Sequence, residues 1–396
     1  MELFQASNQW STRPADERFQ TITALFEACK AYAATAREAK IPVASIRTEA
    51  VDTAVQLVGK AGNFAKLTHW AFGQLAARIG APASYLRELP ATLACQNLNH
   101  GLARYANRAD IANLLFHQNG SLLLRAFTSD EYARIWNWEV AERLLTLEAQ
   151  GWTAATPDKR FDGGDPSQCQ VCNGTGKNPA AAPCGTCKGT GRALPALYAS
   201  DHDMFAFVRN NSAVIREAGN PDGLQRGVIV QNSEVGASAL KLTRFLYREM
   251  CGNHIIWGAS NVMEIKVRHV GNARYRWSGY EAELRRYLNQ SAGEDEARIS
   301  AAKTCKIGDT KEQVLDRLFG MRNLALPRKT LEAGYDATRR DQDGSPDTVW
   351  GMVQGLTRHS QTVPFADNRT AIDAAAGRAG VIPPRPPLYR VIRSRH

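Results

Sequence analysis

Residues 111–127 read IANLLFHQNGSLLLRAF, in which two apolar runs flank the dipeptide Asn119-Gly120. Asn-Gly supplies the positive φ angles that a type I′ turn requires, so this stretch predicts an antiparallel β-hairpin. Two more extended segments are expected upstream, at Ala54–Val58 and Asn63–Thr68, paired across a glycine-containing turn. We therefore predict an N-terminal lobe of strands and helices over residues 41–165.

Helices are expected on both sides of this hairpin. A long helix is predicted over Ala15–Lys40, because its apolar residues recur every three or four positions and Pro42 would end it. Another is predicted over His69–Ile79. A third is predicted over Asp130–Ala149, with Ser129 as its N-cap.

The second half of the chain changes from strand-like to helical patterns near residue 278. Ala237–Met250 fits a strand at period two and a helix at period 3.6, and we favour a strand because the neighbouring segments are strand-like. Helices are predicted over 279–290, 295–306, 311–321, 328–340, 347–362 and 370–379. The tail, 383–396, is rich in Pro and Arg and favours an extended polyproline II form.

These patterns predict an α+β fold: a mixed or antiparallel central sheet lobe with flanking helices, a small four-cysteine zinc-knuckle insertion and a helical C-terminal region. The expected units are an N-terminal tail and helix (1–40), an α/β lobe (41–165), the zinc insertion (166–193), a basic β-rich lobe (194–277), a helical region (278–382) and the tail (383–396). The sequence has no run of 18 apolar residues and no signal-peptide pattern, so we expect a cytoplasmic protein without a membrane span.

The only clear internal repeat lies in residues 169–191. Cys-Gln-Val-Cys-Asn-Gly-Thr-Gly at 169–176 returns as Cys-Gly-Thr-Cys-Lys-Gly-Thr-Gly at 184–191, so each copy reads C-x-x-C-x-G-x-G. A two-residue gap lets both thiolates of one copy reach a single ion, and the glycines let the backbone turn around it. A disulfide is disfavoured in a reducing compartment, and a redox C-x-x-C would need only one pair. We therefore predict that one structural Zn²⁺ is held by Cys169, Cys172, Cys184 and Cys187.

This repeat resembles the cysteine-rich zinc region of the Hsp40 chaperones. That family carries four copies and two zinc sites, whereas this chain has two copies and would form one site. The sequence has no His-Pro-Asp loop of the kind that the J domain of that family carries. The resemblance is limited to residues 169–191, so it does not extend to chaperone function.

The rest of the chain resembles a family that is common on phages and plasmids, the domain of unknown function 932. Four stretches carry the likeness: Gln74–Pro82 with Tyr85-Leu86, Arg125–Ser129 with Tyr132, Asn232–Gly236 leading to Cys251–Asn253, and Arg268-His269 with Trp350. The resemblance implies a mobile-element setting, in which such genes often lie near those for single-stranded DNA handling or anti-restriction. It assigns no chemistry to any of these residues.

The chain carries 49 Lys and Arg against 39 Asp and Glu, a net charge of +10. Such an excess favours an anionic partner, of which nucleic acid is the commonest. Residues 238–277 contain seven cations and two glutamates, with aromatic residues between the cations. We predict that nucleic acid is contacted by Lys241, Arg244, Arg248, Lys266, Arg268, Arg274, Tyr275, Arg276 and Trp277.

A basic groove that follows the phosphates, with rings on which bases stack, is what single-strand binding requires. In a strand, the arginines of Arg274-Tyr275-Arg276-Trp277 would face one side and the rings the other. The alternative is a solvated strand face over an aromatic core, with no ligand. Further candidates for phosphate contact are the arginines of the tail and Lys177, Lys188 and Arg192 of the zinc insertion.

The sequence contains no P-loop, H-E-x-x-H or G-x-S-x-G motif, and we expect no enzymatic activity. The alternative is an enzyme whose carboxylates converge in three dimensions from distant positions in the chain. His254 lies near Cys251, but a nucleophile pair needs an orienting group, and a structural pair is favoured. The leading hypothesis is a mobile-element protein that binds single-stranded nucleic acid, with DNA favoured, for strand protection, annealing or recombination. It would act alone or as a homo-oligomer. The alternative is an interaction factor that counters a host defence system by binding a host protein.

Overall fold

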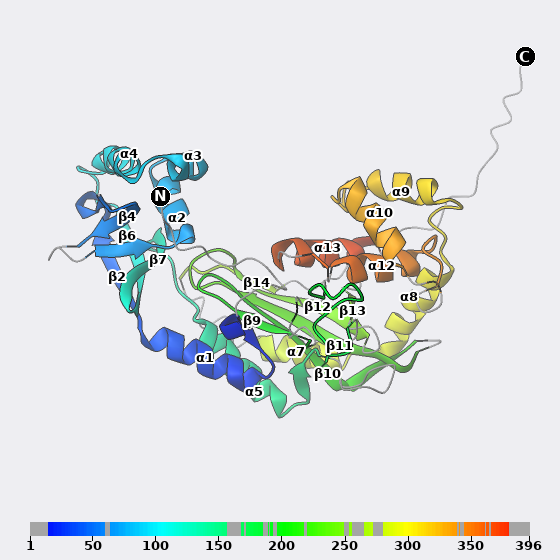
Figure 1. Cartoon of the computed structure of the whole chain (residues 1–396). Helices are drawn as coiled ribbons and strands as arrows, with labels where there is room; N and C mark the ends of the chain where they lie inside the picture. The colour runs from blue at the N-terminus through cyan, green and yellow to red at the C-terminus, as the bar shows by residue number, and fades with distance from the viewer. Residues whose placement is uncertain are drawn as a thin grey trace, which may run out of the picture.

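Two β-sheets and the helices that cover them form the body of the protein (Figure 1). The computed structural model describes residues 15–59, 64–156, 168–169, 172–184, 189, 191–192, 196–217, 220–248, 253–255, 265–271, 280–338, 340, 344–360, 362–363 and 366–379. Within these ranges the strands form one six-stranded and one eight-stranded sheet. The predicted α+β class is confirmed, with mixed and antiparallel pairing and a helical C-terminal region.

The first sheet is mixed and has the strand order β2-β6-β7-β5-β4-β3, in which β5 and β7 run parallel. Its strands are β2 (Ala36–Pro42), β3 (Arg47–Val51), β4 (Ala54–Val58), β5 (Phe64–Leu67), β6 (Ile111–Asn119) and β7 (Ser121–Ser129). The predicted hairpin over 111–127 is confirmed as β6 and β7, and Gly120 has a positive φ of 66°. The helices packed on this sheet are α2 (His69–Arg78), α3 (Ala83–Glu88) and α4 (Ala91–Ala103).

The second sheet is antiparallel and follows the order β1-β9-β10-β11-β12-β13, with β14 beside β12 and β8 beside β10. Its strands are β1 (Arg18–Phe19), β8 (Trp152–Ala154), β9 (Leu197–Ala199), β10 (Met204–Glu217), β11 (Asn220–Asn232), β12 (Leu240–Arg248), β13 (Asn253–Ile255) and β14 (Ile265–Val267). The strand favoured over Ala237–Met250 is therefore confirmed as β12.

Side chains alternate between the two sides of the second sheet, as they must in a strand. On the lower side, apolar residues such as Val228 and Leu242 pack against α1 (Ile22–Ala34), α5 (Asn137–Glu148) and α7 (Tyr280–Leu288). On the upper side, rings such as Phe205 and Phe245 form a second cluster that reaches α13 (Ala366–Ala379). Figure 1 shows α1, α5 and α7 below the sheet and α13 above it.

The C-terminal helices share a core of their own around Trp350, Val353 and Leu356. They are α8 (Ala292–Thr304), α9 (Lys311–Phe319), α10 (Arg328–Ala337), α12 (Val349–Ser360) and α13. Together with α7 they match the six helices predicted for this region to within a few residues at each end. The remaining helical pieces are the 3-10 turns η1 (Ala15–Glu17) and η2 (Val43–Ser45). None of the helices within the described ranges is both long enough and apolar enough to cross a membrane.

Two predicted helices are wrong in their bounds. The helix predicted over Ala15–Lys40 is wrong at both ends. It begins only at Ile22, after the 3-10 turn η1 and the strand β1, and it stops at Ala34. Ala36–Pro42 instead pairs along its whole length with β6. A free sheet edge outweighs helical periodicity here, because every residue of β2 gains a partner on β6. The helix predicted over Asp130–Ala149 begins only at Asn137, because Tyr132 and Arg134 are held in contacts between the two sheets.

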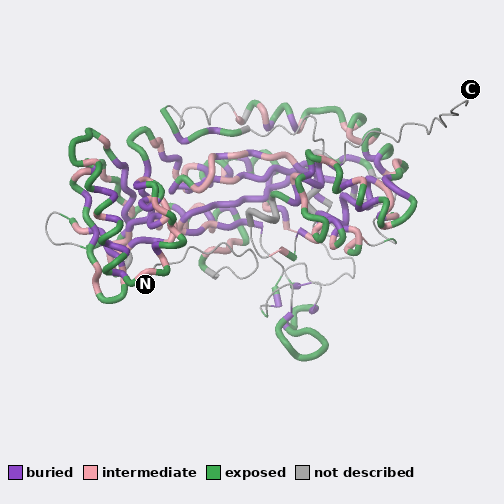
Figure 2. The backbone as a smooth tube through the Cα atoms, turned by 90° about the horizontal axis from the view of Figure 1, so that it is seen from above, coloured by how far each residue is buried: buried purple, intermediate pink, exposed green. Residues whose placement is uncertain are grey.

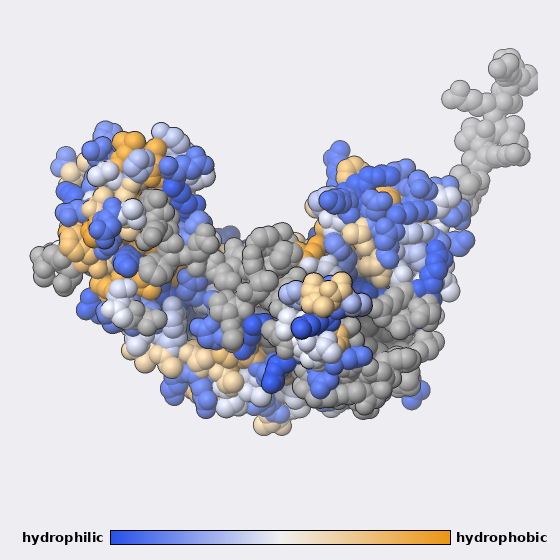
Figure 3. All heavy atoms as spheres, viewed as in Figure 1, coloured by the Kyte–Doolittle hydropathy of each residue, from blue (hydrophilic) through white to orange (hydrophobic). Residues whose placement is uncertain are grey.

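The first sheet with its helices and the C-terminal helices rise on the same side of the second sheet. Figure 3 shows the surface hollowed between these two raised lobes. The upper side of the second sheet forms the middle of this arrangement, between the lobes (Figure 1). We call it the concave side.

Candidate functional site

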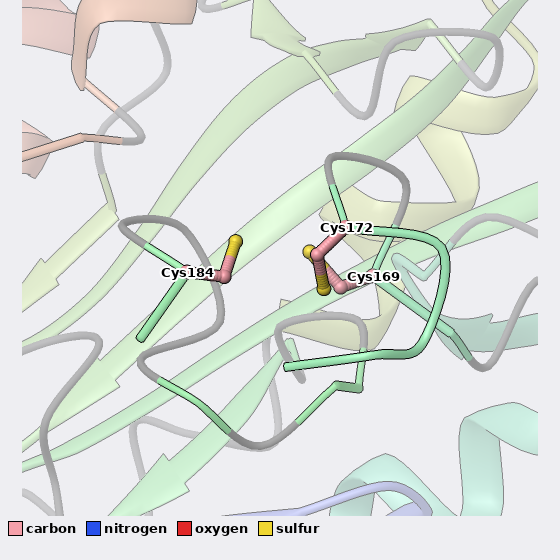
Figure 4. Close-up of side chains that lie close together, drawn as sticks. All are labelled: Cys169, Cys172 and Cys184. Carbon is pink, nitrogen blue, oxygen red and sulfur yellow. The ribbon is translucent and has the colours of Figure 1, made fainter. Parts of the chain in front are cut away.

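Three cysteines from the two copies of the repeat lie together. The Sγ atoms of Cys169, Cys172 and Cys184 all lie within 4.8 Å of one another. Figure 4 shows Cys184 facing the pair Cys169 and Cys172 from the opposite loop. Tetrahedral zinc–thiolate bonds of about 2.3 Å place sulfurs about 3.8 Å apart, so this group could hold a metal ion. Cys187, the fourth predicted ligand, lies outside the described residues.

The two copies hold each other through a repeated backbone exchange. The amide of Cys169 donates to the carbonyl of Gly191, and the amide of Cys184 donates to the carbonyl of Gly176, each at 2.8 Å. The first cysteine of each copy thus binds the last glycine of the other. This reciprocity explains why the repeat is needed twice.

Glycine is required where the copies meet. Gly176 and Gly191 have positive φ angles of 71° and 70°, which residues with a Cβ rarely adopt. A Cβ on Gly176 would lie 2.3 Å from the carbonyl oxygen of Gly189, and one on Gly191 would lie 2.2 Å from that of Gly174. The glycines of the repeat therefore serve both the turn and the close approach of the two backbones.

The cysteine module, residues 168–192, is an excursion from one point of the second sheet. The amide of Ala155 donates to the carbonyl of Phe207 at 2.8 Å, and the amide of Phe207 donates to the carbonyl of Ala196 at 2.9 Å. The chain thus leaves and returns beside the same residue of β10. Figure 2 shows the module as an exposed loop that stands away from the body.

The predicted nucleic-acid contacts are divided between the two sides of the second sheet. Lys241 lies on the concave side and is paired with Lys266 across β12 and β14. Lys266 and Arg268 are exposed, and Lys241 is half-buried. Arg244 points to the lower side, where its guanidinium lies 4.5 Å from the ring centroid of Tyr287 on α7.

Aromatic residues of the same region do not offer open rings on the described strands. Phe245 is 1% and Tyr247 is 0% exposed, so both belong to the core of the concave side. Arg248 ends β12, and its side chain lies outside the described part of the chain. The same holds for Trp257 and for the whole of Arg274-Tyr275-Arg276-Trp277. Base stacking at these positions stays a prediction.

A buried ion pair joins the two sheets. Arg125 on β7 donates from Nη2 to Oε2 of Glu234 at 2.9 Å, and the two side chains are 0% and 2% exposed. Arg125 also donates from Nε and Nη2 to the carbonyl of Asp201, which precedes β10. Its guanidinium lies 4.5 Å from the ring centroid of Tyr32 on α1. One arginine of the first sheet is thus surrounded by groups of the second sheet and its helices.

Glu234 lies where β11 ends, in residues 232–236, which include the last residue of that strand and which we call the junction turn. Its Oε1 accepts from the amide of Asn137 in the first turn of α5 at 2.8 Å, and its carbonyl accepts from Arg134. A carboxylate at a helix N-terminus is also favoured by the helix dipole.

Other elements hold the remainder of the junction turn. The carbonyl of Val235 accepts from Trp70 Nε1 at 3.1 Å and from Gln74 Nε2 at 2.7 Å, both on α2. Tyr132 Oη donates to the carbonyl of Ser233 at 3.0 Å. The junction turn is therefore fixed by hydrogen bonds from α2, α5 and the segment between β7 and α5.

Burial sets the protonation of groups around the junction turn. Burial alone would lower the pKa of Arg125, but the interactions with Glu234, Tyr32 and Asp201 together outweigh it, and the pKa is held above its usual value. The pKa of His117 is lowered to about 4 by burial and by the positive charge of Arg125. The pKa of His269 is lowered to about 4 by burial and by Arg134. Both histidines are therefore neutral at neutral pH.

No chemical role was assigned to these junction residues from sequence, although Arg125, Tyr132, Asn232–Gly236 and His269 belong to stretches that carry the family likeness. One signal was available. An arginine inside the apolar run Leu122–Phe127 cannot be buried without a partner, so it predicts a carboxylate elsewhere in the chain. The sequence does not say which of its 39 acidic residues that partner is.

Comparison with known proteins gives one match. No curated protein and no solved structure matches the chain. A family model matches residues 195–376, which begin just after the cysteine module and run from the second sheet through the C-terminal helices. Over these residues the chain is similar to the family described as Domain of unknown function (DUF932).

Proposed function

We propose that the protein binds single-stranded nucleic acid on the concave side of the second sheet, without catalysing a reaction. Lys241, Lys266 and Arg268 would contact phosphates there. The setting would be a mobile element, as the resemblance to phage and plasmid proteins implies, and DNA is the favoured polymer.

One observation carries the proposal: Lys241 and Lys266 are directly opposite each other on neighbouring strands. Like charges in that arrangement repel and destabilise a sheet. Two ammonium groups on the same side of neighbouring strands would both attract a phosphate group that lies between them. Arg268 continues the same row one pleat farther, and the net charge of +10 acts in the same direction.

The cysteine module would support this function through one structural Zn²⁺. Cys169, Cys172 and Cys184 would supply three thiolates and Cys187 the fourth. Four protein ligands leave no open position, so the ion would stabilise the module and take no part in a reaction. Cobalt substitution tests this, because a cobalt–thiolate centre has characteristic absorption bands whose intensity reports the number of sulfur ligands.

The test of nucleic-acid binding is a titration with a fluorescent single-stranded oligonucleotide at several salt concentrations. For single strands, the slope of log affinity against log salt is about −0.7 per phosphate contact. Because the two lysines would share one phosphate, the variant Lys241→Ala with Lys266→Ala should reduce the steepness of the slope by about 0.7, which corresponds to about 5-fold weaker binding at 0.1 M salt. If the wild-type protein does not bind at low salt, the proposal fails.

A matched control removes two positive charges from the opposite side of the second sheet. Lys30 on α1 and Arg285 on α7 are both exposed on helices that cover the lower side. The variant Lys30→Ala with Arg285→Ala should keep the slope of the wild-type protein. An equal loss in both variants would mean that overall charge, and not the concave side, decides binding.

The exposed position of the cysteine module favours a second candidate, an interaction factor that binds a host protein (Figure 2). The two candidates separate when residues 157–195 are replaced by a short glycine linker. Loss of nucleic-acid binding on deletion would assign the module to the first function. Retained nucleic-acid binding, with loss of a host protein captured from nuclease-treated lysate, would support the second.

A further inference from the structure

The proposed binding surface and the junction turn share two short stretches of chain. Lys241 is paired with Gln231, the last residue before the junction turn. Arg268 directly precedes His269, whose carbonyl accepts from the amide of Ala133 at 2.8 Å. The cations that would meet phosphates are therefore held at the point where the first sheet joins the second.

We propose that Glu234 is a positioning residue for this surface. It holds the junction turn against the first sheet, and so it fixes Lys241 opposite Lys266 and sets the N-terminal lobe at the edge of the concave side. The proposal rests on nucleic-acid binding at this surface. It concerns how the surface is held, since Glu234 itself is buried.

The contacts of Glu234 connect the junction turn to two strands of the first sheet and to α5. Its side chain joins Arg125 of β7 to the first turn of α5. Its carbonyl accepts from Arg134, whose Nε donates to Glu38 of β2 at 2.8 Å. A turn tied in this way cannot slide along the first sheet, and the strand that follows it starts in a fixed register.

Positioning and simple charge effects predict opposite signs. Removing a carboxylate from a protein that binds a polyanion raises its net charge, which by itself strengthens binding. If Glu234 positions the cations, its loss weakens binding, because Lys241 and Lys266 no longer share one phosphate. The sign of the change therefore separates the two explanations.

The experiment compares Glu234→Gln with Glu294→Gln, which makes the same change in charge at an exposed position on α8. Each is titrated with the single-stranded oligonucleotide at several salt concentrations. A second readout is the distance between spin labels attached to unnatural amino acids at Leu93 on α4 and Phe319 on α9, two exposed positions on the two lobes. Circular dichroism establishes that the variants are folded.

At 0.1 M salt, we expect Glu234→Gln to bind up to about 5-fold more weakly than the wild-type protein, with a salt slope that is less steep by up to about 0.7, the full contribution of the phosphate shared by Lys241 and Lys266. The distribution of distances between its two spin labels should be broader than in the wild-type protein. Glu294→Gln should change neither the binding nor this distribution. Equal or tighter binding by Glu234→Gln, with unchanged distances, overturns the proposal.

Two safeguards keep the test decisive. If Glu234→Gln does not fold, Tyr132→Phe replaces it, because this change removes only the hydroxyl group, which hydrogen-bonds the backbone of the junction turn at Ser233 and Gly236, and keeps the ring stacked on His269. If the wild-type protein does not bind nucleic acid, the proposed function fails by itself. The label distances then decide whether the junction turn holds the lobes, and unchanged distances in both variants exclude that role.

Discussion

Replacing Gly191 with alanine should weaken metal binding by the cysteine module far more than replacing Gly189 does. Both glycines have positive φ angles, 70° and 89°, so each alanine costs about 1–2 kcal/mol of backbone strain. At Gly189 no steric clash adds to this strain, since the new Cβ would lie 3.7 Å from its nearest neighbouring atom. That strain alone weakens binding about 5- to 30-fold.

At Gly191 the new Cβ would lie 2.2 Å from a carbonyl oxygen, more than 1 Å inside the usual contact of about 3.5 Å. The backbone must move, and the hydrogen bond from Cys169 to Gly191 is lost at a further cost of about 1 kcal/mol. The total of about 2–3 kcal/mol corresponds to about 30- to 150-fold weaker binding, and displacement of Cys169 adds to it.

The assay is competition for Zn²⁺ against a chromophoric chelator, with cobalt spectra to report the thiolate ligands. Gly176→Ala should match Gly191→Ala, because its Cβ would meet a carbonyl at 2.3 Å. Equal affinities for Gly189→Ala and Gly191→Ala would refute the reasoning that the close approach of the two backbones decides binding.

Three other outcomes test the described contacts. Arg125→Met should lower the free energy of unfolding by about 3–5 kcal/mol, because it leaves the Glu234 carboxylate buried without its counterion. The double variant with Glu234→Leu should lose less stability than the sum of the two single variants. Urea denaturation of the wild-type protein and the three variants measures these losses, and strictly additive losses would contradict the prediction. Lowering the pH from about 6.5 to about 4 should destabilise the protein, since the buried neutral forms of His117 and His269 have pKa values lowered to about 4 and the unfolded chain takes up protons first. Thermal melts across this range should show a shallower decline for His117→Asn, and an unchanged decline counts against the assignment. Arg226→Met should lower the free energy of unfolding by about 2–4 kcal/mol, because Nη1 of Arg226 lies 2.8 Å from three carbonyls, two in the last turn of α7 and one just after it. A loss below about 1 kcal/mol in the same denaturation assay would mean that water hydrogen-bonds these carbonyls in place of the guanidinium.

Local patterns predicted much of the fold. Asn119-Gly120 identified the hairpin of β6 and β7, because the turn depends on those two residues alone. The spacing of apolar residues identified the C-terminal helices, and the repeat identified the cysteine module. The sequence also predicts that the two cations lie on opposite sides of the sheet, since Lys241 and Arg244 are three residues apart in a strand.

The parts that local patterns missed depend on distant partners. Ala36–Pro42 carries no clear alternation of apolar residues, and it becomes a strand because β6 offers a free edge. Arg125 and Glu234 are 109 residues apart, so no window of sequence contains both. The segment from Tyr132 to Trp136 reads as helix, but its side chains are used between the two sheets.

The order in which the chain is synthesised bears on how it folds. The first sheet uses residues 36–129 only, so all its strands are present early. β1 at residues 18–19 pairs with β9 at residues 197–199, and at about 5–20 residues per second it waits roughly 10–35 s for that partner. During this interval the first sheet and its helices can fold, while the apolar side of α1 has no second sheet to pack against. The emerging chain therefore presents one apolar side of α1 before its partner sheet exists, and until then only α5 can cover that helix.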